Sequence, residues 1–142
     1  LQQAILQTDA ARQRLQEVEN SEDFAADKAQ LETLSSEYEQ LAKDFQRDQA
    51  AMSEEDQIAA SQKLAGKRSD MEYVYKKLEA VNRQTTEKVM QELAPQVQEV
   101  LQEVIAADQI GLLLRAETVI HSSIAFDITA KVTDKMNQLG TE

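Results

Sequence analysis

Residues 31–45 read LETLSSEYEQLAKDF and residues 71–85 read MEYVYKKLEAVNRQT, and these two stretches decide the fold. In each of them, apolar side chains return at alternating spacings of three and four residues. Those of the first stretch are Leu31, Leu34, Tyr38, Leu41 and Phe45, and those of the second are Met71, Val74, Leu78 and Val81. A period of 3.5 residues keeps one narrow apolar stripe turned toward a partner helix. The pattern therefore predicts a coiled coil.

The two stripes fit each other if the chain reverses between Met52 and Ser53, because facing residues then have numbers that sum to about 105. This register predicts a seam of four apolar pairs, namely Phe24 with Val81, Leu31 with Val74, Leu34 with Met71, and Leu41 with Leu64. It also leaves mismatches, such as Asp27 opposite Leu78. Ser53 is a suitable cap for the second helix, since serine accepts hydrogen bonds from free helical N–H groups. We therefore predict an antiparallel hairpin arm over residues 21–93, with its tip near 52–54.

The composition supports long helices. The 142 residues include three Gly and one Pro, and a compact globule of this length needs more turn residues than that. Apolar residues make up 42% and charged residues 29%, which excludes a low-hydrophobicity disordered chain. The aromatic share of 4%, without Trp, is small for a thick core.

Residues 1–20 and 94–142 are expected to form a second part, a body. A short helix around Ala4–Leu6 should precede the arm, with a cap at Thr8 or Asp9 and a kink near Asn20. Pro95 lies inside the second arm helix and removes one of its hydrogen bonds, so we predict a hinge there. Beyond it the apolar face widens over Val97, Val100, Leu101, Val104 and Ile105, which indicates contact with something bulkier than one helix.

Residues 110–115 have the length and composition of a short buried strand, and residues 119–122 are predicted to pair back onto it. A final helix should start at a cap on Asp127 and pack against the body through Ile128, Val132, Met136 and Leu139. A lone β-hairpin is marginally stable in water. We therefore expect the body to be built from several chains, or to include a strand that precedes Leu1, or both.

The residue inventory argues against catalysis and against cofactor or metal binding. There is no Cys, and the only His, His121, lacks the Gly-containing elbow that a Ser-His-Asp hydrolase needs near its nucleophile. The acids Glu54, Glu55 and Asp56 lack the Gly-bearing loop of a calcium site and fit the start of a helix instead. A net charge of −11 speaks against binding nucleic acid.

Two features of the arm remain open to a functional reading. Lys63, Lys67 and Arg68, followed by the pair 76–77, form a basic stretch that fits either an anion site or a solvated face with ion pairs, and the second is favoured. Ile58 and Tyr73 lie beside the apolar seam. They are candidate contact residues for an apolar partner, although single exposed apolar residues are common.

Three parts of the chain carry a likeness to a known family. They are the short opening segment 1–8, LQQAILQT, the coiled-coil hairpin, and the tail, whose residues 93–97 (LAPQV), 106–114 (AADQIGLLL) and 126–132 (FDITAKV) are the most specific. Through these parts the sequence resembles the Skp (OmpH-like) family of periplasmic chaperones.

The resemblance implies a homotrimer in which three chains jointly build a small β-barrel-like body, and three helical arms enclose a cavity. It implies an ATP-independent holdase of the periplasm that keeps unfolded outer-membrane β-barrel proteins from aggregating. It further implies a first strand that precedes Leu1. The best-known members are strongly basic, whereas this chain is acidic, which argues against lipopolysaccharide or membrane contact.

Two other kinds of protein fit the hairpin. A prefoldin-like cytosolic chaperone also combines coiled-coil hairpins with a β body, but its β-hairpin lies between the two helices. A passive coiled-coil spacer or adaptor would form a stable rod without affinity for unfolded proteins.

Overall fold

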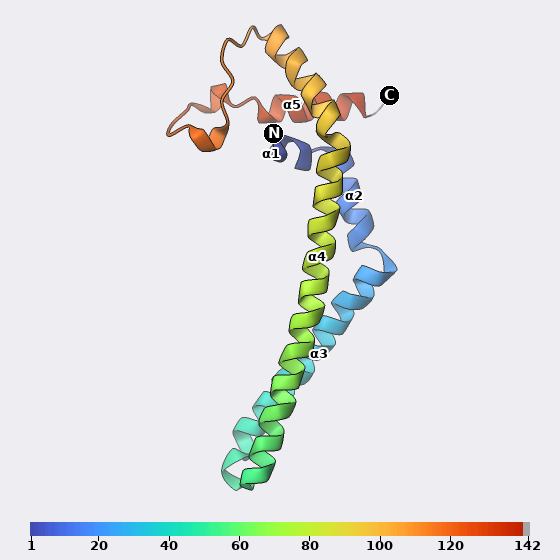
Figure 1. Cartoon of the computed structure of the whole chain (residues 1–142), viewed down its shortest axis with the longest axis vertical. Helices are drawn as coiled ribbons and strands as arrows, with labels where there is room; N and C mark the ends of the chain where they lie inside the picture. The colour runs from blue at the N-terminus through green and yellow to red at the C-terminus, as the bar shows by residue number, and fades with distance from the viewer. Residues whose placement is uncertain (141–142) are drawn as a thin grey trace. The chain divides into compact units, whose positions relative to one another are not determined.

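The computed structural model describes residues 1–140 and consists of helices joined by turns and one long loop (Figure 1). It divides into two compact units. The arm is Val18–Arg83, and the body joins Leu1–Glu17 to the segment that begins at Gln84. The predicted boundary at residue 94 lies within the body, because Val89 is buried in the core of that unit.

Two helices form the arm. Helix α3 (Glu22–Asp48) ends in a single 3-10 turn, η1 (Gln49–Ala51), and α4 (Glu54–Ala107) begins three residues later and runs back alongside it (Figure 1). The start of this helix directly after Ser53, predicted from the sequence, is confirmed. The helix continues without interruption past Pro95.

The apolar seam of the arm is short and well defined. Leu34, Val74 and Leu78 are buried, and Phe24, Leu31 and Met71 pack against them half-buried. Leu41, Leu64 and Val81 are half-buried as well. A two-helix arrangement covers only one stripe of each helix, so these side chains supply the arm's hydrophobic stabilisation.

Ion pairs explain the polar residues beside the seam. The Lys77 ammonium lies 2.8 Å from a carboxylate oxygen of Asp27, whose side chain is largely buried. Further toward the tip, Lys67 pairs with Glu37. Asp27 and Lys67, which the sequence register sets against an apolar and an aromatic side chain, are thus each paired with a charge one position away. Burying Asp27 is tolerated because it keeps a cation beside it.

Side-chain caps define where the arm helices begin. The Ser21 hydroxyl oxygen accepts a hydrogen bond from the Phe24 N–H at 3.4 Å, so the chain breaks between α2 (Asp9–Glu19) and α3 instead of only kinking. Ser53 accepts from the Asp56 N–H at 3.2 Å and donates to the Asp56 carboxylate at 2.6 Å. The first bond satisfies an N–H group that a helix start leaves free, and the second fixes the Ser53 hydroxyl in place.

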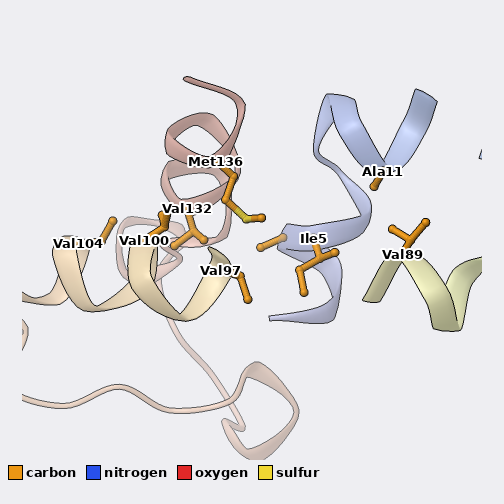
Figure 2. Close-up of a cluster of buried hydrophobic side chains, with 9 residues drawn as sticks. Ile5, Ala11, Val89, Val97, Val100, Val104, Val132 and Met136 are labelled. Carbon is orange, nitrogen blue, oxygen red and sulfur yellow. The ribbon is translucent and has the colours of Figure 1, made fainter. Parts of the chain in front are cut away.

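The body packs four helices around an aliphatic core. Helix α1 (Gln2–Leu6) and the start of α2 meet the last third of α4, and α5 (Thr129–Leu139) lies against them (Figure 1). Figure 2 shows Val132 of α5 beside α4, Met136 extending toward α1, and Ala11 facing Val89. The buried residues are Ala4, Ile5, Ala11, Val89, Val97, Val100, Val104, Val132 and Met136. Leu139, predicted to lie on the body, is exposed because it follows the last buried turn of α5.

Polar contacts join the two ends of the chain within the body. The amide oxygen of Asn137 accepts a hydrogen bond from the Asp9 N–H at 2.9 Å, at the start of α2. The buried Thr133 hydroxyl donates to the Ala4 carbonyl at 3.1 Å. Thr8, also buried, accepts from the Ala11 N–H at 3.2 Å. Helix α5 therefore holds α1 and α2 through hydrogen bonds as well as through apolar contact.

Helix α4 ends in a Schellman motif. Gln109 adopts a positive φ of 53°, and the Ile110 N–H donates to the Ile105 carbonyl at 3.0 Å. This arrangement satisfies carbonyl groups at the helix end and turns the chain out of the helical direction. Ile110 packs against the core. The apolar segment that follows starts from this point.

The strands predicted at 110–115 and 119–122 are not formed within the described residues. Two short 3-10 turns, η2 (Ala116–Thr118) and η3 (Ile124–Phe126), interrupt an otherwise extended loop. No backbone hydrogen bond joins residues 111–115 to residues 119–123 in the described part of the chain. A strand needs a partner for its backbone groups, and one copy of this chain supplies none at this place.

The core predicts a large effect at Ile5, which is 2% exposed. Ile5→Ala should lower the free energy of unfolding by about 2–5 kcal/mol, because it removes buried methyl groups and leaves a cavity. Ile58→Ala on the exposed arm surface is the matched control and should change it by less than about 1 kcal/mol. Chemical denaturation followed by circular dichroism measures both, and equal effects would contradict the assigned core.

The ion pair of Lys77 predicts a second effect on stability. Lys77→Met leaves the largely buried Asp27 carboxylate without its cation, so the arm should melt at a lower temperature than the parent protein. Lys76→Met breaks a solvent-exposed pair with Glu72 one residue away and should change the melting temperature little. If the two substitutions lower the melting temperature equally, the stability of the arm does not depend on the pairing of the buried Asp27 with Lys77.

Candidate functional site

Exposed apolar side chains on α4 form the first candidate contact surface. Ile58 is 54% exposed and Tyr73 is 72% exposed, at the positions that the sequence singles out. They lie 15 residues apart on one helix, a rise of about 22 Å, so they do not make one patch. Tyr75, 59% exposed, is an additional residue that sequence reasoning missed. Its position next to the seam residue Val74 was the available signal.

The surface near Ile58 is slightly hollowed at the tip of the arm. The Gln57 side-chain amide donates to the Gln49 carbonyl at 3.0 Å and to the Met52 carbonyl at 3.3 Å, which closes the turn. The shallow groove beside it is lined by Phe45, Gln49, Glu54, Gln57, Ile58, Ser61, Gln62 and Ala65. It is open to solvent and suits brief contact with a flexible chain better than enclosure of a small molecule.

The basic stretch of the arm is largely occupied by ion pairs. Lys67 pairs with Glu37, Lys76 with Glu72, and Lys77 with Asp27. The hydrogen bond from Lys76 lowers the pKa of Glu72, and the same bond raises the pKa of Lys76. Hydrogen bonding to Asp27 raises the pKa of Lys77. The solvated face with ion pairs thus describes these three residues.

The loop between α4 and α5 is the second candidate surface, and it is the most apolar exposed region of the described chain. Leu112 is 74% exposed and Ile124 is 89% exposed. The other exposed apolar side chains of the loop are Leu113, Leu114, Ile120 and Phe126. The sequence predicts this segment as buried, and in the single chain it is not. Contiguous exposed apolar surface of this kind is typical of protein interaction sites.

The residues that were weighed as catalytic or metal-binding groups do not cluster. His121 is exposed in the loop, and Ser53 and Asp56 bond to each other as a helix cap. Among residues 1–140, no three His, Cys, Asp or Glu side chains gather in an arrangement that holds a metal ion. The same residues contain no helix that is both long enough and apolar enough to cross a bilayer.

Its fold, a helical hairpin joined to a small helical body, places this chain in the general class of helical-hairpin proteins. A family model described as Outer membrane protein (OmpH-like) matches residues 1–136, and the chain belongs to this family. This confirms the resemblance inferred from the sequence. The family is associated with chaperones that bind outer-membrane proteins. Comparison with curated proteins found no match, and comparison with solved structures found none either.

The start of α5 predicts a pH-dependent effect at Asp127. Its carboxylate accepts a hydrogen bond from the Thr129 N–H at 2.9 Å, and bonding to Thr129 lowers the pKa of Asp127 below its ordinary value of 3.8. A lowered pKa in the folded state stabilises the fold above the ordinary value, and this contribution is lost as the pH falls through the lowered value. The residue directly before α5 is Ile128 and not the predicted Asp127, and the Ile128 side chain makes no cap bond. Asp127 bonds to the first helical N–H from one position earlier, and its contribution is fully present near neutral pH.

Asp127→Ala should therefore melt below the parent protein at pH 6, and the difference should shrink between about pH 4 and pH 2. Asp127→Asn keeps an oxygen that can accept from the Thr129 N–H, so it should retain more of the parent's stability at pH 6. Melting temperatures of the three proteins across this pH range make the comparison. A constant difference between parent and Asp127→Ala would show that the charged cap has no role.

Proposed function

We propose that this protein is an ATP-independent holdase of the periplasm that binds unfolded outer-membrane β-barrel proteins and prevents their aggregation. The observation that carries the proposal is the family match over nearly the whole chain, combined with apolar side chains that the arm exposes to solvent. Binding lowers the free concentration of the unfolded client, and aggregation depends on that concentration. The proposed role is therefore binding and not catalysis, and it needs no cofactor.

The arm is suited to many weak contacts. Ile58 lies 15 residues before Tyr73, and the buried Val74 separates Tyr73 from Tyr75, so the three exposed side chains do not form one deep specific pocket. A chain without fixed structure has apolar side chains at irregular intervals, and dispersed sites can engage several of them at once. Multiple weak contacts add up through high effective concentration once the first contact forms.

We further propose a homotrimer. The loop segments 111–115 and 119–123 make no backbone hydrogen bonds to each other in one chain, which leaves donors and acceptors of both for strands from other copies. Pairing between copies would cover the exposed leucines and produce the β body that the family resemblance implies. Three arms projecting from one body would then enclose a cavity for the client. We propose Pro95 as a hinge within α4, because a proline removes one backbone hydrogen bond from its helix.

The acidic charge of the chain affects the partners. At a net charge of −11, contact with anionic lipid or lipopolysaccharide is opposed by repulsion, and we propose no such contact.

The prefoldin-like alternative predicts strands between the two arm helices. At that place the described chain has the 3-10 turn Gln49–Ala51, and the extended loop follows α4 instead.

An aggregation assay tests the proposed function. An outer-membrane β-barrel protein unfolded in urea is diluted into buffer with and without this protein, and light scattering is followed without ATP. We expect scattering to be suppressed at about one trimer per client. The triple variant Ile58→Ser, Tyr73→Ser and Tyr75→Ser should need about fivefold more protein for half suppression, equivalent to about 1 kcal/mol of lost apolar contact.

Glu79→Ser, which changes an exposed polar residue of the same helix, is the control and should leave the suppression unchanged. Absence of suppression by the parent protein would overturn the holdase proposal and favour a passive coiled-coil spacer. Suppression that the triple variant retains in full would show that the client contacts lie elsewhere.

A further inference from the structure

The loop between α4 and α5 is closed at its base by an ion pair between residues from both helix ends. The Lys131 ammonium lies 2.5 Å from each carboxylate oxygen of Asp108. Asp108 directly follows the last residue of α4, and Lys131 is the third residue of α5. Ile110 and Ile128, close to each partner in sequence, pack against the body core. The ion pair therefore lies where the loop leaves the folded body.

Both charges stand at helix ends that local electrostatics disfavours. A helix carries partial negative charge at its carboxyl end, where Asp108 adds an anion, and partial positive charge at its amino end, where Lys131 adds a cation. The last turn of α4 has no basic residue, and the first turn of α5 has no acidic one. Each charge is unfavourable at its own helix end, and the contact between Asp108 and Lys131 compensates for this. Such a conflict between local and tertiary preference is typical of positions with a functional task.

The rest of the loop has little else to hold it. Residues 111–115 and 119–123 make no backbone hydrogen bonds to each other, and their apolar side chains are exposed. The positions of the two ends therefore determine where these extended segments can be found. Bringing the ends of a loop together costs conformational entropy. A contact at the base of the loop offsets this entropy loss within the single chain, so less of it remains to be offset when another copy binds.

We propose that the Asp108–Lys131 ion pair is a positioning contact for assembly, which closes the loop base and so prepares the two extended segments to pair with other copies of this chain. This inference rests on the homotrimer proposed above and adds the residues that control its formation. It makes trimer assembly sensitive to a contact inside each chain, away from the pairing backbone itself.

A second ion pair between the same helices provides a matched comparison. The Lys135 ammonium lies 2.5 Å from a carboxylate oxygen of Glu103, also bridging α4 and α5. Its partners lie about one turn further into each helix and do not flank the loop. Loss of this pair removes the same kind of contact between the two helices while the loop base stays closed.

The experiment measures assembly of the full chain against protein concentration by sedimentation velocity, with helix content and melting followed by circular dichroism. For Asp108→Asn and Lys131→Met we expect the fraction of chains with a closed loop base to fall about two- to threefold, which is typical for loss of a partly exposed ion pair. Over three chains this raises the trimer dissociation constant about ten- to thirtyfold. The concentration for half assembly then rises about three- to fivefold. Glu103→Gln and Lys135→Met should shift it by less than twofold.

The exchanged variant with Asp108→Lys and Lys131→Asp restores the pair in reverse and should return half assembly to the parent value. Equal shifts for both ion pairs, or failure of the exchange to restore assembly while helix content is normal, would overturn the inference. A parent protein that stays monomeric at all concentrations would overturn the proposed homotrimer, and with it this contact. A trimeric parent with an unaffected Asp108→Asn variant overturns the positioning role alone.

Discussion

Two helices lying side by side can bury only one stripe each, and the structure of the arm follows from that constraint. Three side chains, Leu34, Val74 and Leu78, are buried in the seam, and most of the remaining surface of both helices faces water. Charged and polar residues must therefore cover most of the arm, which they do through ion pairs such as Lys77 with Asp27. The same constraint leaves room for Ile58, Tyr73 and Tyr75 on the exposed surface, because no second layer covers α4 there.

The arm could be predicted from the sequence because its heptad period and its helix caps depend on residues that are close together in the chain. Heptad spacing identified the seam residues, and Ser53 with Asp56 marks the start of α4 within one residue. The ion pair between Asp27 and Lys77 could not be predicted from the register, which sets Asp27 opposite Leu78. The long Lys77 side chain reaches Asp27 from one position away. Counting residues shows which positions face each other, but it does not show which neighbouring positions a long side chain can reach.

The loop shows the opposite case. Its β-branched and aliphatic residues predict strands, and the composition is correct for pairing, but pairing depends on a partner that the local sequence does not contain. In one chain Leu112 and Ile124 are exposed, although their residue types are typical of an interior. The candidate contact residues on α4 were accessible only in part, because Tyr75 lies one position from the seam and exposure there depends on the crossing of the two helices.

The hydrogen bond between Asp9 and Asn137 joins residues 128 positions apart, whereas the ion pair between Asp27 and Lys77 spans 50. During translation the arm can therefore zip together as soon as the first half of α4 has left the ribosome, but the body must wait for the final helix. Until α5 is made, Val97, Val100 and Val104 form an apolar stripe without their final cover. The nascent chain therefore passes through a stage in which the arm is complete while the apolar face of α4 in the body is still exposed, and at that stage the chain is prone to aggregate.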